Sequence, residues 1–281
     1  MGRTCPVYAD GISDDLESDD DPDNVGSGAP SAEQLTADMA DLRSGIDDLA
    51  GLVAGRLGLP EVLAEVATFA VRAIPGADGA GVALLRVDDP EDRVVALAAS
   101  DPFVVVVDEI QFTTVNEGPA ISAALDRRTV RSGSLGGERL WPRFGPRAGR
   151  LGVHSVLSMP MSLPDRVIGA ITVYAHGKDV FDDHAAELGE LFAKPAAVAV
   201  HNAHILADAL ALTVQLRTAL STRATIDQAI GIIRARTGRS AADAFAQLRG
   251  MSQTEHRKLA DVAQAVVDEA VRRARVRRNP A

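Results

Sequence analysis

The sequence predicts an α+β protein: an antiparallel sheet with covering helices, joined by a coiled-coil helix to a C-terminal module of three helices. Two observations lead to this prediction. Strand-like runs are grouped in the middle of the chain, with helical patterns before, between and after them, which favours an antiparallel sheet over a parallel one. Beyond these runs, apolar residues recur four and three positions apart until the chain reaches short helical patterns rich in arginine.

Charge divides the chain into an acidic body and a basic end. Residues 211–281 hold 13 Lys and Arg against 6 Asp and Glu, whereas residues 1–210 hold 16 against 33. The whole-chain net charge of −10 therefore conceals an end of about +7 on a body of about −17. Such an asymmetry bears on partners rather than on fold, and it indicates that the C-terminal region contacts a polyanion.

Length and composition predict a cytoplasmic protein. With 281 residues and 46% hydrophobic content, the chain can bury a core in two modest domains with linking helices. The first ten residues lack the apolar run of a signal peptide, and no stretch approaches the roughly 20 apolar residues that span a bilayer. Cys5 is the only cysteine, which excludes an intrachain disulfide and a thiolate zinc site. We expect no metal and no cofactor.

The N-terminal region divides into a tail and a helix. Residues 1–30 are dense in like charge and predict a disordered acidic tail. Residues 31–58 predict an amphipathic helix that opens at Ser31, with Gln34 completing a capping box. Its apolar seam needs another helix, either of a dimer partner or of the same chain. The seam consists of Leu35, Met39, Leu42, Ile46, Leu49 and Val53.

Residues 59–203 predict the mixed domain. Pro60 near the start of the first pattern and the turn PGADG after it bound an opening helix over 60–74. Further helices are expected at 119–125 and 142–151. The periodicity predicts strands at 81–87, 93–99, 103–110, 130–132, 155–161 and 167–175.

A helical linker over residues 204–222 is predicted to connect this domain to a module at 223–270, which a basic tail at 271–281 follows. Apolar residues at 205, 209, 212, 216 and 219 keep a four-and-three spacing that continues through 226, 230 and 233. A continuous stalk of this kind can carry a change in helix register or packing from one domain to the other.

Helix signals divide the C-terminal module into three helices. Gly238 is a helix stop, Ser240 with Asp243 forms a capping pair, and Ser252 with Glu255 fits a second capping box. Alanines and a glycine at 231 are expected to allow close helix approach. The expected core consists of Ala229, Ile233, Ala244, Phe245, Leu248, Leu259 and Val262.

Four strings in the middle domain resemble the GAF family of small-molecule sensors. They are NEGPAISAAL at 116–125, RLWPRFGPRAGRLGVHSVLSMPM at 139–161, RVIGAITVYA at 166–175 and FDDHAAELGELFAKPAAVAVHNA at 181–203. The resemblance implies a GAF-like sensor domain with a ligand pocket between the sheet and its covering helices, although nothing in the sequence marks the ligand. Gly169 is expected to allow close backbone approach in a strand.

The C-terminal segment resembles the ANTAR family of RNA-binding antiterminator modules over about residues 211–270. The matching residues include Arg223, Gln228-Ala229, Ala235-Arg236, Ala244-Phe245 and Lys258-Leu259. One departure is Ile230, because family members commonly carry lysine at this position. If that lysine contacts phosphate, affinity for RNA is reduced here or is supplied by Arg234 and Arg236.

These resemblances imply a transcription antitermination regulator whose GAF-like domain senses a small molecule. The expected partners are paired RNA stem-loops, an unidentified ligand in the GAF pocket and a second copy of the chain in a homodimer. Arginine both donates to phosphate and stacks on bases. The candidate RNA-binding residues are Arg223, Arg234, Arg236, Arg239, Arg249, Arg257 and Lys258.

Two alternatives stand beside this function. One is a dimeric ligand sensor or adaptor whose C-terminal helices bind a protein partner rather than RNA, and Ile230 keeps this alternative open. The other is an enzyme. GAF-fold methionine sulfoxide reductases act through cysteines that this domain lacks, and no GxSxG, P-loop or paired-carboxylate motif is present, so no catalytic residues are expected.

Overall fold

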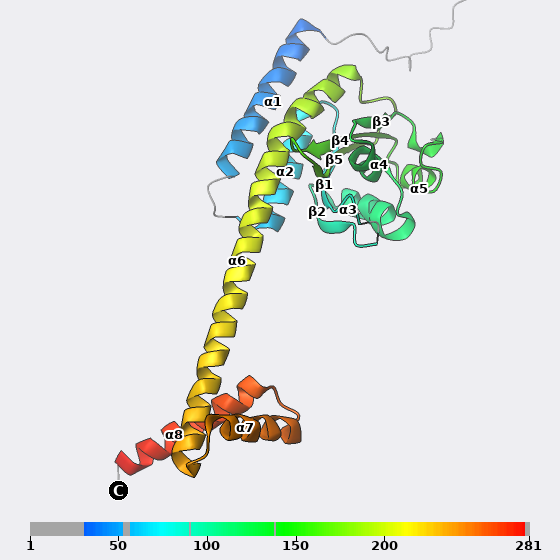
Figure 1. The fold of residues 1–281 in the computed structure, drawn as a ribbon. Helices are drawn as coiled ribbons and strands as arrows, with labels where there is room; N and C mark the ends of the chain where they lie inside the picture. The colour runs from blue at the N-terminus through cyan, green and yellow to red at the C-terminus, as the bar shows by residue number, and fades with distance from the viewer. Residues whose placement is uncertain (1–30, 53–56, 90, 138, 279–281) are drawn as a thin grey trace, which may run out of the picture.

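The computed structural model describes residues 31–52, 57–89, 91–137 and 139–278. The predicted acidic tail, Cys5 and Val53 lie outside the described residues. The remaining chain forms a sheet domain, a long helix and a small helical domain at the far end of that helix (Figure 1). The predicted α+β class, with an antiparallel sheet and a helical C-terminal module, is confirmed.

The sheet has five strands in the order β2-β1-β5-β4-β3, and every neighbouring pair is antiparallel. The longest strand, β5, lies at the centre and is buried at all nine positions, because helices cover both of its faces. Gly169 in β5 allows β1 to approach closely, as expected, since a Cβ there would overlap the carbonyl oxygen of Ala83 in β1. The strands are β1 Gly79–Leu85, β2 Val94–Ala99, β3 Val130–Ser132, β4 Ser155–Ser162 and β5 Val167–Ala175.

One face of the sheet packs against α2 (Leu59–Ala73) and the first turns of α6 (Asp183–Thr237). Helix α1 (Ala32–Leu52) packs against these two helices (Figure 1). Leu42 and Leu49 of α1 are buried in this layer. Helices of the same chain therefore cover the apolar seam of α1 at Leu42 and Leu49, while Leu35 and Met39 near the start of α1 remain exposed.

The opposite face carries shorter helices. The layer beneath them is filled by its own side chains, with Phe144 and Tyr174 fully buried and Trp141 nearly so. Protein atoms therefore fill the part of the expected ligand pocket around these rings, while a cavity of about 420 Å³ remains between the sheet and the helical layer near Val94, Leu97 and Phe112. The elements are α3 (Pro102–Glu109), the π-helical segment η1 (Ile110–Val115), α4 (Pro119–Asp126), η2 (Leu135–Gly137) and α5 (Gly145–Arg150).

The strand predicted at 103–110 is wrong, because this segment forms α3 and the start of η1. Its run of valines favours a strand by propensity. Asp101 nevertheless caps a helix by accepting a hydrogen bond from the Phe103 amide at 3.1 Å, and Pro102 occupies the first turn. Val104 and Val107 then pack beneath the helix, so tertiary packing overrides propensity.

A single helix of 55 residues, α6, connects the two ends of the molecule. It begins in the layer beside α2, emerges as a stalk and ends in the C-terminal domain (Figure 1). Within the described residues, α6 alone is long and apolar enough to cross a bilayer, with a window of mean hydropathy 1.4 of which 17% is buried. The expectation that no stretch of the chain approaches the length of a membrane span therefore does not hold for α6. Length and composition alone are weak evidence for such a span.

Two more helices, α7 (Ala241–Glu255) and α8 (Leu259–Arg278), pack around the end of α6. Gly238 ends α6 with a φ of 70°, and the Ser240 hydroxyl caps α7 by accepting from the Asp243 amide at 3.2 Å. Both predicted signals are confirmed. Helix α8 continues to Arg278, so the segment expected to be a basic tail is helical up to that residue.

The second predicted capping box is wrong. Ser252 and Glu255 lie inside α7, and His256 caps its C-terminal end in a left-handed conformation. The Ser252 hydroxyl instead donates to the carbonyl of Arg257 at 2.6 Å and so closes the turn into α8.

Two expectations about the core of the C-terminal domain also fail. Phe245 is 39% exposed rather than buried, and a Cβ at Gly231 would meet no atom within 4 Å, so no helix approaches closely there. Leu259 is only partly buried. The buried core consists of Ala229, Ile233, Ala244, Leu248, Val262 and Ala263.

Candidate nucleic-acid interface and sensor groove

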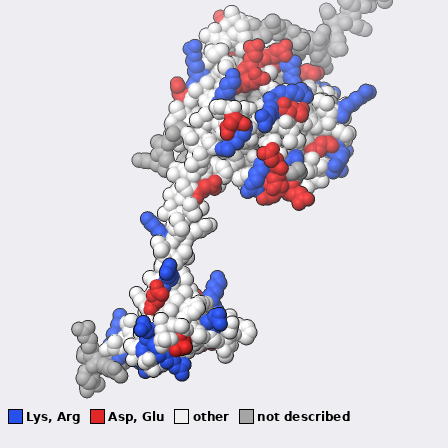
Figure 2. Space-filling model, viewed as in Figure 1, with Lys and Arg blue, Asp and Glu red and all other residues white. Residues whose placement is uncertain are grey.

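The seven predicted RNA-binding residues are all exposed on the C-terminal domain. Arg223, Arg234 and Arg236 project from α6, Arg239 lies in the turn before α7, and Arg249 lies on α7. Arg257 and Lys258 occupy the turn between α7 and α8. Figure 2 shows basic side chains dominating this domain, whereas both signs are interspersed over the sheet domain.

Most of these cations have no acidic partner. Among the described residues, only Arg257 of the seven forms an ion pair, with Glu255 at 3.0 Å, and it also donates to the Asp261 carbonyl at 3.4 Å. The other six guanidinium and ammonium groups are available to an external anion. An unpaired exposed cation loses no ion pair when it binds phosphate, whereas a paired cation must first break its ion pair with a carboxylate.

The arginines of α6 do not form a single face. Arg223 and Arg234 are eleven residues apart, so at 100° per residue they share one side of the helix about 16 Å apart. Arg236 lies on the other flank of the apolar stripe that packs into the core. The predicted RNA-binding arginines of α6 therefore lie on both sides of the apolar stripe that packs into the core.

Ile230 lies on the same side of α6 as Arg223 and Arg234 and is located between them. It is partly buried and packs against the core of the three-helix domain. A lysine here would place its charge in the same row as the two arginines. Isoleucine instead adds apolar contact to the core, and the row has a neutral gap.

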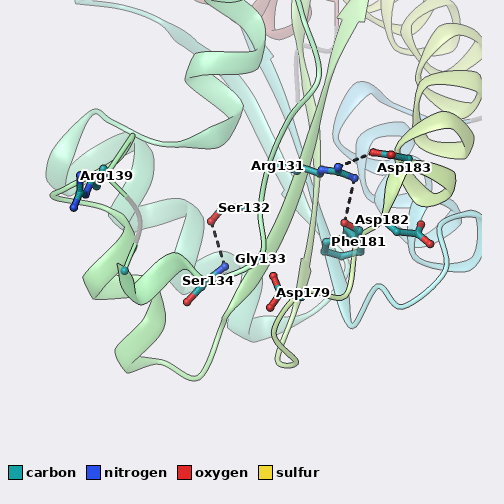
Figure 3. Close-up of a pocket in the computed structure, with 10 residues that line it drawn as sticks. Arg131, Ser132, Gly133, Ser134, Arg139, Asp179, Phe181, Asp182 and Asp183 are labelled. Carbon is teal, nitrogen blue, oxygen red and sulfur yellow. Dashed lines mark hydrogen bonds and ion pairs between the residues drawn. The ribbon is translucent and has the colours of Figure 1, made fainter. Parts of the chain in front are cut away.

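A groove of about 740 Å³ lies at the edge of the sheet, where β3 meets the start of α6 (Figure 3). Arg131 on β3 forms an ion pair with Asp183 in the first turn of α6 at 2.6 Å. Asp182 caps α6 by accepting from the Ala185 amide at 2.8 Å. The lining residues are Arg131, Ser132, Gly133, Ser134, Gly137, Arg139, Asp179, Phe181, Asp182 and Asp183.

The sequence does not predict this groove. Its two walls come from the loop after β3 and the loop before α6, joined by a hydrogen bond from the Asp179 amide to the Gly133 carbonyl at 3.0 Å. These loops are more than forty positions apart in the chain, so only the strand order brings them together. A molecule in this groove would contact the first turn of the helix that leads to the basic domain.

A buried polar cluster, which the sequence also does not predict, lies beneath α3 and η1. The Tyr174 hydroxyl donates to the Asp108 carboxyl at 2.9 Å, and the Gln111 side-chain oxygen accepts from the Ala120 amide at 2.8 Å. Burial raises the pKa of Asp108 to about 7, and the Tyr174 hydrogen bond only partly opposes this effect. Burial, followed by the nearby Asp108 carboxyl, also raises the pKa of Tyr174 well above its usual value.

The fold and these surfaces define a regulatory protein in which a sensor-type α+β domain is connected through one helix to a basic helical domain. The chain belongs to the GAF domain family, whose model matches residues 57–201, and it also carries an ANTAR domain over residues 214–267. The predicted family resemblances are confirmed. GAF domains are small-molecule sensors and ANTAR domains are RNA-binding antitermination modules, so both are regulatory rather than catalytic.

Solved structures are similar to part of this chain at low identity. The GAF domain of an Acinetobacter phosphoenolpyruvate-protein phosphotransferase is 13% identical, covering 59% of this chain and 97% of its own, with a TM-score of 0.45. A free methionine-R-sulfoxide reductase from Neisseria meningitidis, in complex with its substrate, is 17% identical, covering 64% and 96%, with a TM-score of 0.45. No curated protein matches the chain.

Proposed function

We propose that this protein is a cytoplasmic, dimeric regulator that binds paired RNA stem-loops and prevents transcription termination under the control of a small molecule. The observation that carries the proposal is the set of exposed, unpaired cations on the C-terminal domain, which belongs to an RNA-binding family. The charge of about +7 over residues 211–281 supplies the long-range attraction.

The stalk supports the dimer. Every seventh residue of α6 from Leu191 onward is apolar, and the first four of these, at 191, 198, 205 and 212, are each 46 to 55% exposed. Leu216, at the alternate position of the same repeat, is 56% exposed. A seven-residue apolar repeat left uncovered on one helix is the pattern of a coiled coil, and a second copy in parallel would cover it.

Asn202 supports a parallel, in-register pair. It occupies the alternate core position of the same repeat, three residues before Ile205, and is exposed in the single chain. A polar residue at one core position of a coiled coil fixes register, because it finds its hydrogen-bond partner only opposite itself. A parallel stalk would place the two basic domains side by side at one end.

The groove at the start of α6 supports control by a ligand. A molecule that competes for Arg131 or Asp183 would act on the first turn of the stalk helix. A change in the packing of that helix within a dimer would alter the spacing of the two basic domains. Hydrogen exchange along α6 that stays unchanged by a ligand which alters RNA binding would exclude this mechanism.

The test is a titration of the purified full chain against a two-hairpin RNA and a scrambled control across salt concentrations. We expect binding that depends on the hairpins and a negative slope of log K against log salt. Arg234→Ala with Arg236→Ala should weaken binding and reduce the slope by about two. Equal binding of both RNAs, or none, would contradict the proposal and favour a protein partner for the C-terminal helices.

A further inference from the structure

Phe245 is an aromatic residue left uncovered on a basic domain. It is the only Phe, Tyr or Trp after Phe192 in the sequence. Of the Phe, Tyr and Trp rings that the structure describes it is the most exposed, at 39%, while Trp141, Phe144 and Tyr174 are buried in the sheet domain. The core of the C-terminal domain is filled without it, by small and aliphatic residues of all three helices.

The surroundings of Phe245 on α7 leave its ring accessible. A helical side chain leans toward the preceding turn, and the residues there, Ala241 and Ala242, are both alanine and exposed. Arg249 follows one turn later on the same face and has no ion-pair partner among the described residues. An open ring is thus next to an unpaired guanidinium.

No carboxylate shares this face. It consists of Ala242, Phe245, Arg249, Ser252 and His256, at spacings of three and four. The acidic residues of α7 project elsewhere and are already paired: Asp243 accepts from the Ser240 hydroxyl at 2.7 Å, and Glu255 pairs with Arg257 at 3.0 Å. The face combines an apolar ring with uncompensated positive charge, which complements a nucleotide.

We propose that Phe245 is a stacking platform for an unpaired base of an RNA hairpin loop, and that Arg249 binds the phosphate next to that base. The proposal rests on the proposed RNA-binding function and adds how the loop is recognised. Loop bases that are splayed out stack on aromatic rings, whereas bases inside a duplex are unavailable to them. This face therefore selects hairpins over continuous duplex RNA.

The experiment compares Phe245→Ala, Phe245→Leu and Phe245→Trp in the full chain. The probe is a two-hairpin RNA with unpaired loops, selected by the wild-type chain from a pool of randomised loops, and the control RNA joins the same stems into a duplex. The alanine and leucine variants should bind the hairpins about ten- to a hundredfold more weakly, and the tryptophan variant should stay near wild type. The salt slope should not change for these variants but should decrease by about one for Arg249→Ala.

Gln247→Ala is the matched control, because Gln247 is exposed on α7 but lies two positions after Phe245, about 200° around the helix from its face. This variant should bind like the wild type. A wild-type chain that binds no hairpin RNA overturns the proposed function itself. A wild-type chain that binds while Phe245→Ala binds equally overturns only the stacking role. Full affinity in Phe245→Leu does so as well, because leucine keeps apolar packing without a π-face, and this comparison decides the matter even if the alanine variant does not fold.

Discussion

At the scale of single residues, Ile230 shows how one side chain can serve stability at the expense of binding. It lies between Arg223 and Arg234 on one side of α6, yet its side chain packs against the core of the C-terminal domain. A lysine at this position could keep its alkyl stem on the core while its ammonium group reaches solvent. The isoleucine thus contributes apolar contact where a cation would contribute phosphate attraction.

Ile230→Lys should therefore strengthen binding of two-hairpin RNA by about fivefold, the effect of one additional exposed ionic contact. The slope of log K against log salt should steepen by about one. Ala224→Lys adds the same charge on an exposed part of α6 off this row and should have less effect on affinity. Fluorescence anisotropy across salt concentrations measures both quantities, and equal gains for the two variants would show that position does not matter.

Asp108 is the residue whose ionisation the fold opposes most clearly. Its folded-state pKa is raised from 3.8 to about 7, so the folded protein keeps a proton that the unfolded chain loses. Its contribution to stability is therefore full below about pH 4 and is lost as the pH rises through about 7. A pKa shift of this size corresponds to a difference in the free energy of unfolding on the order of 4 kcal/mol between low and high pH.

Asp108→Asn keeps an acceptor for the Tyr174 hydroxyl and removes the ionisation. We expect the free energy of unfolding of the wild type to fall relative to this variant between about pH 4 and about pH 8. Urea unfolding followed by fluorescence of Trp141, the only tryptophan and a buried residue of the same layer, measures the difference. If the free energies of unfolding of the two proteins change in parallel with pH, the raised pKa of Asp108 would be contradicted.

At the scale of elements, the sequence predicts the helix ends that depend on local signals, but it does not predict the elements that depend on tertiary packing. Gly238 and Ser240 end one helix and begin the next as expected, because capping depends on a few neighbouring atoms. The valine run of α3 resembles a strand in sequence, since its helical state depends on burial of Val104 and Val107. The misplacement of Phe245 in the core has a related reason: hydrophobicity does not indicate which face of α7 the core occupies.

The stalk is the element whose sequence pattern is not explained by a single chain. Replacing Leu212 and Leu216 by serine removes two apolar side chains from each copy of the proposed seam. At about 1.5 kcal/mol or more for each leucine, the dissociation constant of the dimer should rise by at least about a thousandfold. Sedimentation equilibrium of the full chain measures this change.

Val214→Ser is the matched control, because Val214 is 64% exposed but lies two positions beyond Leu212, outside the repeat. It should leave the dimer intact. A monomeric wild type, or equal dissociation in the control, would contradict a dimer built on this seam.

At the scale of the whole molecule, the strand order of the sheet determines contacts between distant segments that the sequence does not predict. The groove at the start of α6 joins loops that follow β3 and β5, and the cluster of Asp108, Gln111 and Tyr174 joins α3, η1 and the central strand. Motif and periodicity identify both domains and the continuous helix between them. Neither indicates that Arg131 contacts the first turn of that helix, because this contact requires the folded edge of the sheet.

Because one continuous helix joins the two domains, its length and phase determine how a dimer presents them. Duplicating residues 212–218 inserts seven residues and preserves the apolar repeat, whereas duplicating Thr213 and Val214 rotates the far part of the helix by about 200°. The first variant should bind a two-hairpin RNA like the wild type, because both basic domains keep their relation to each other. The second should bind it on the order of a hundredfold more weakly while binding of a single hairpin is unchanged, since only simultaneous engagement is lost. Equal affinity of both variants for the two-hairpin RNA would mean that each C-terminal domain acts alone.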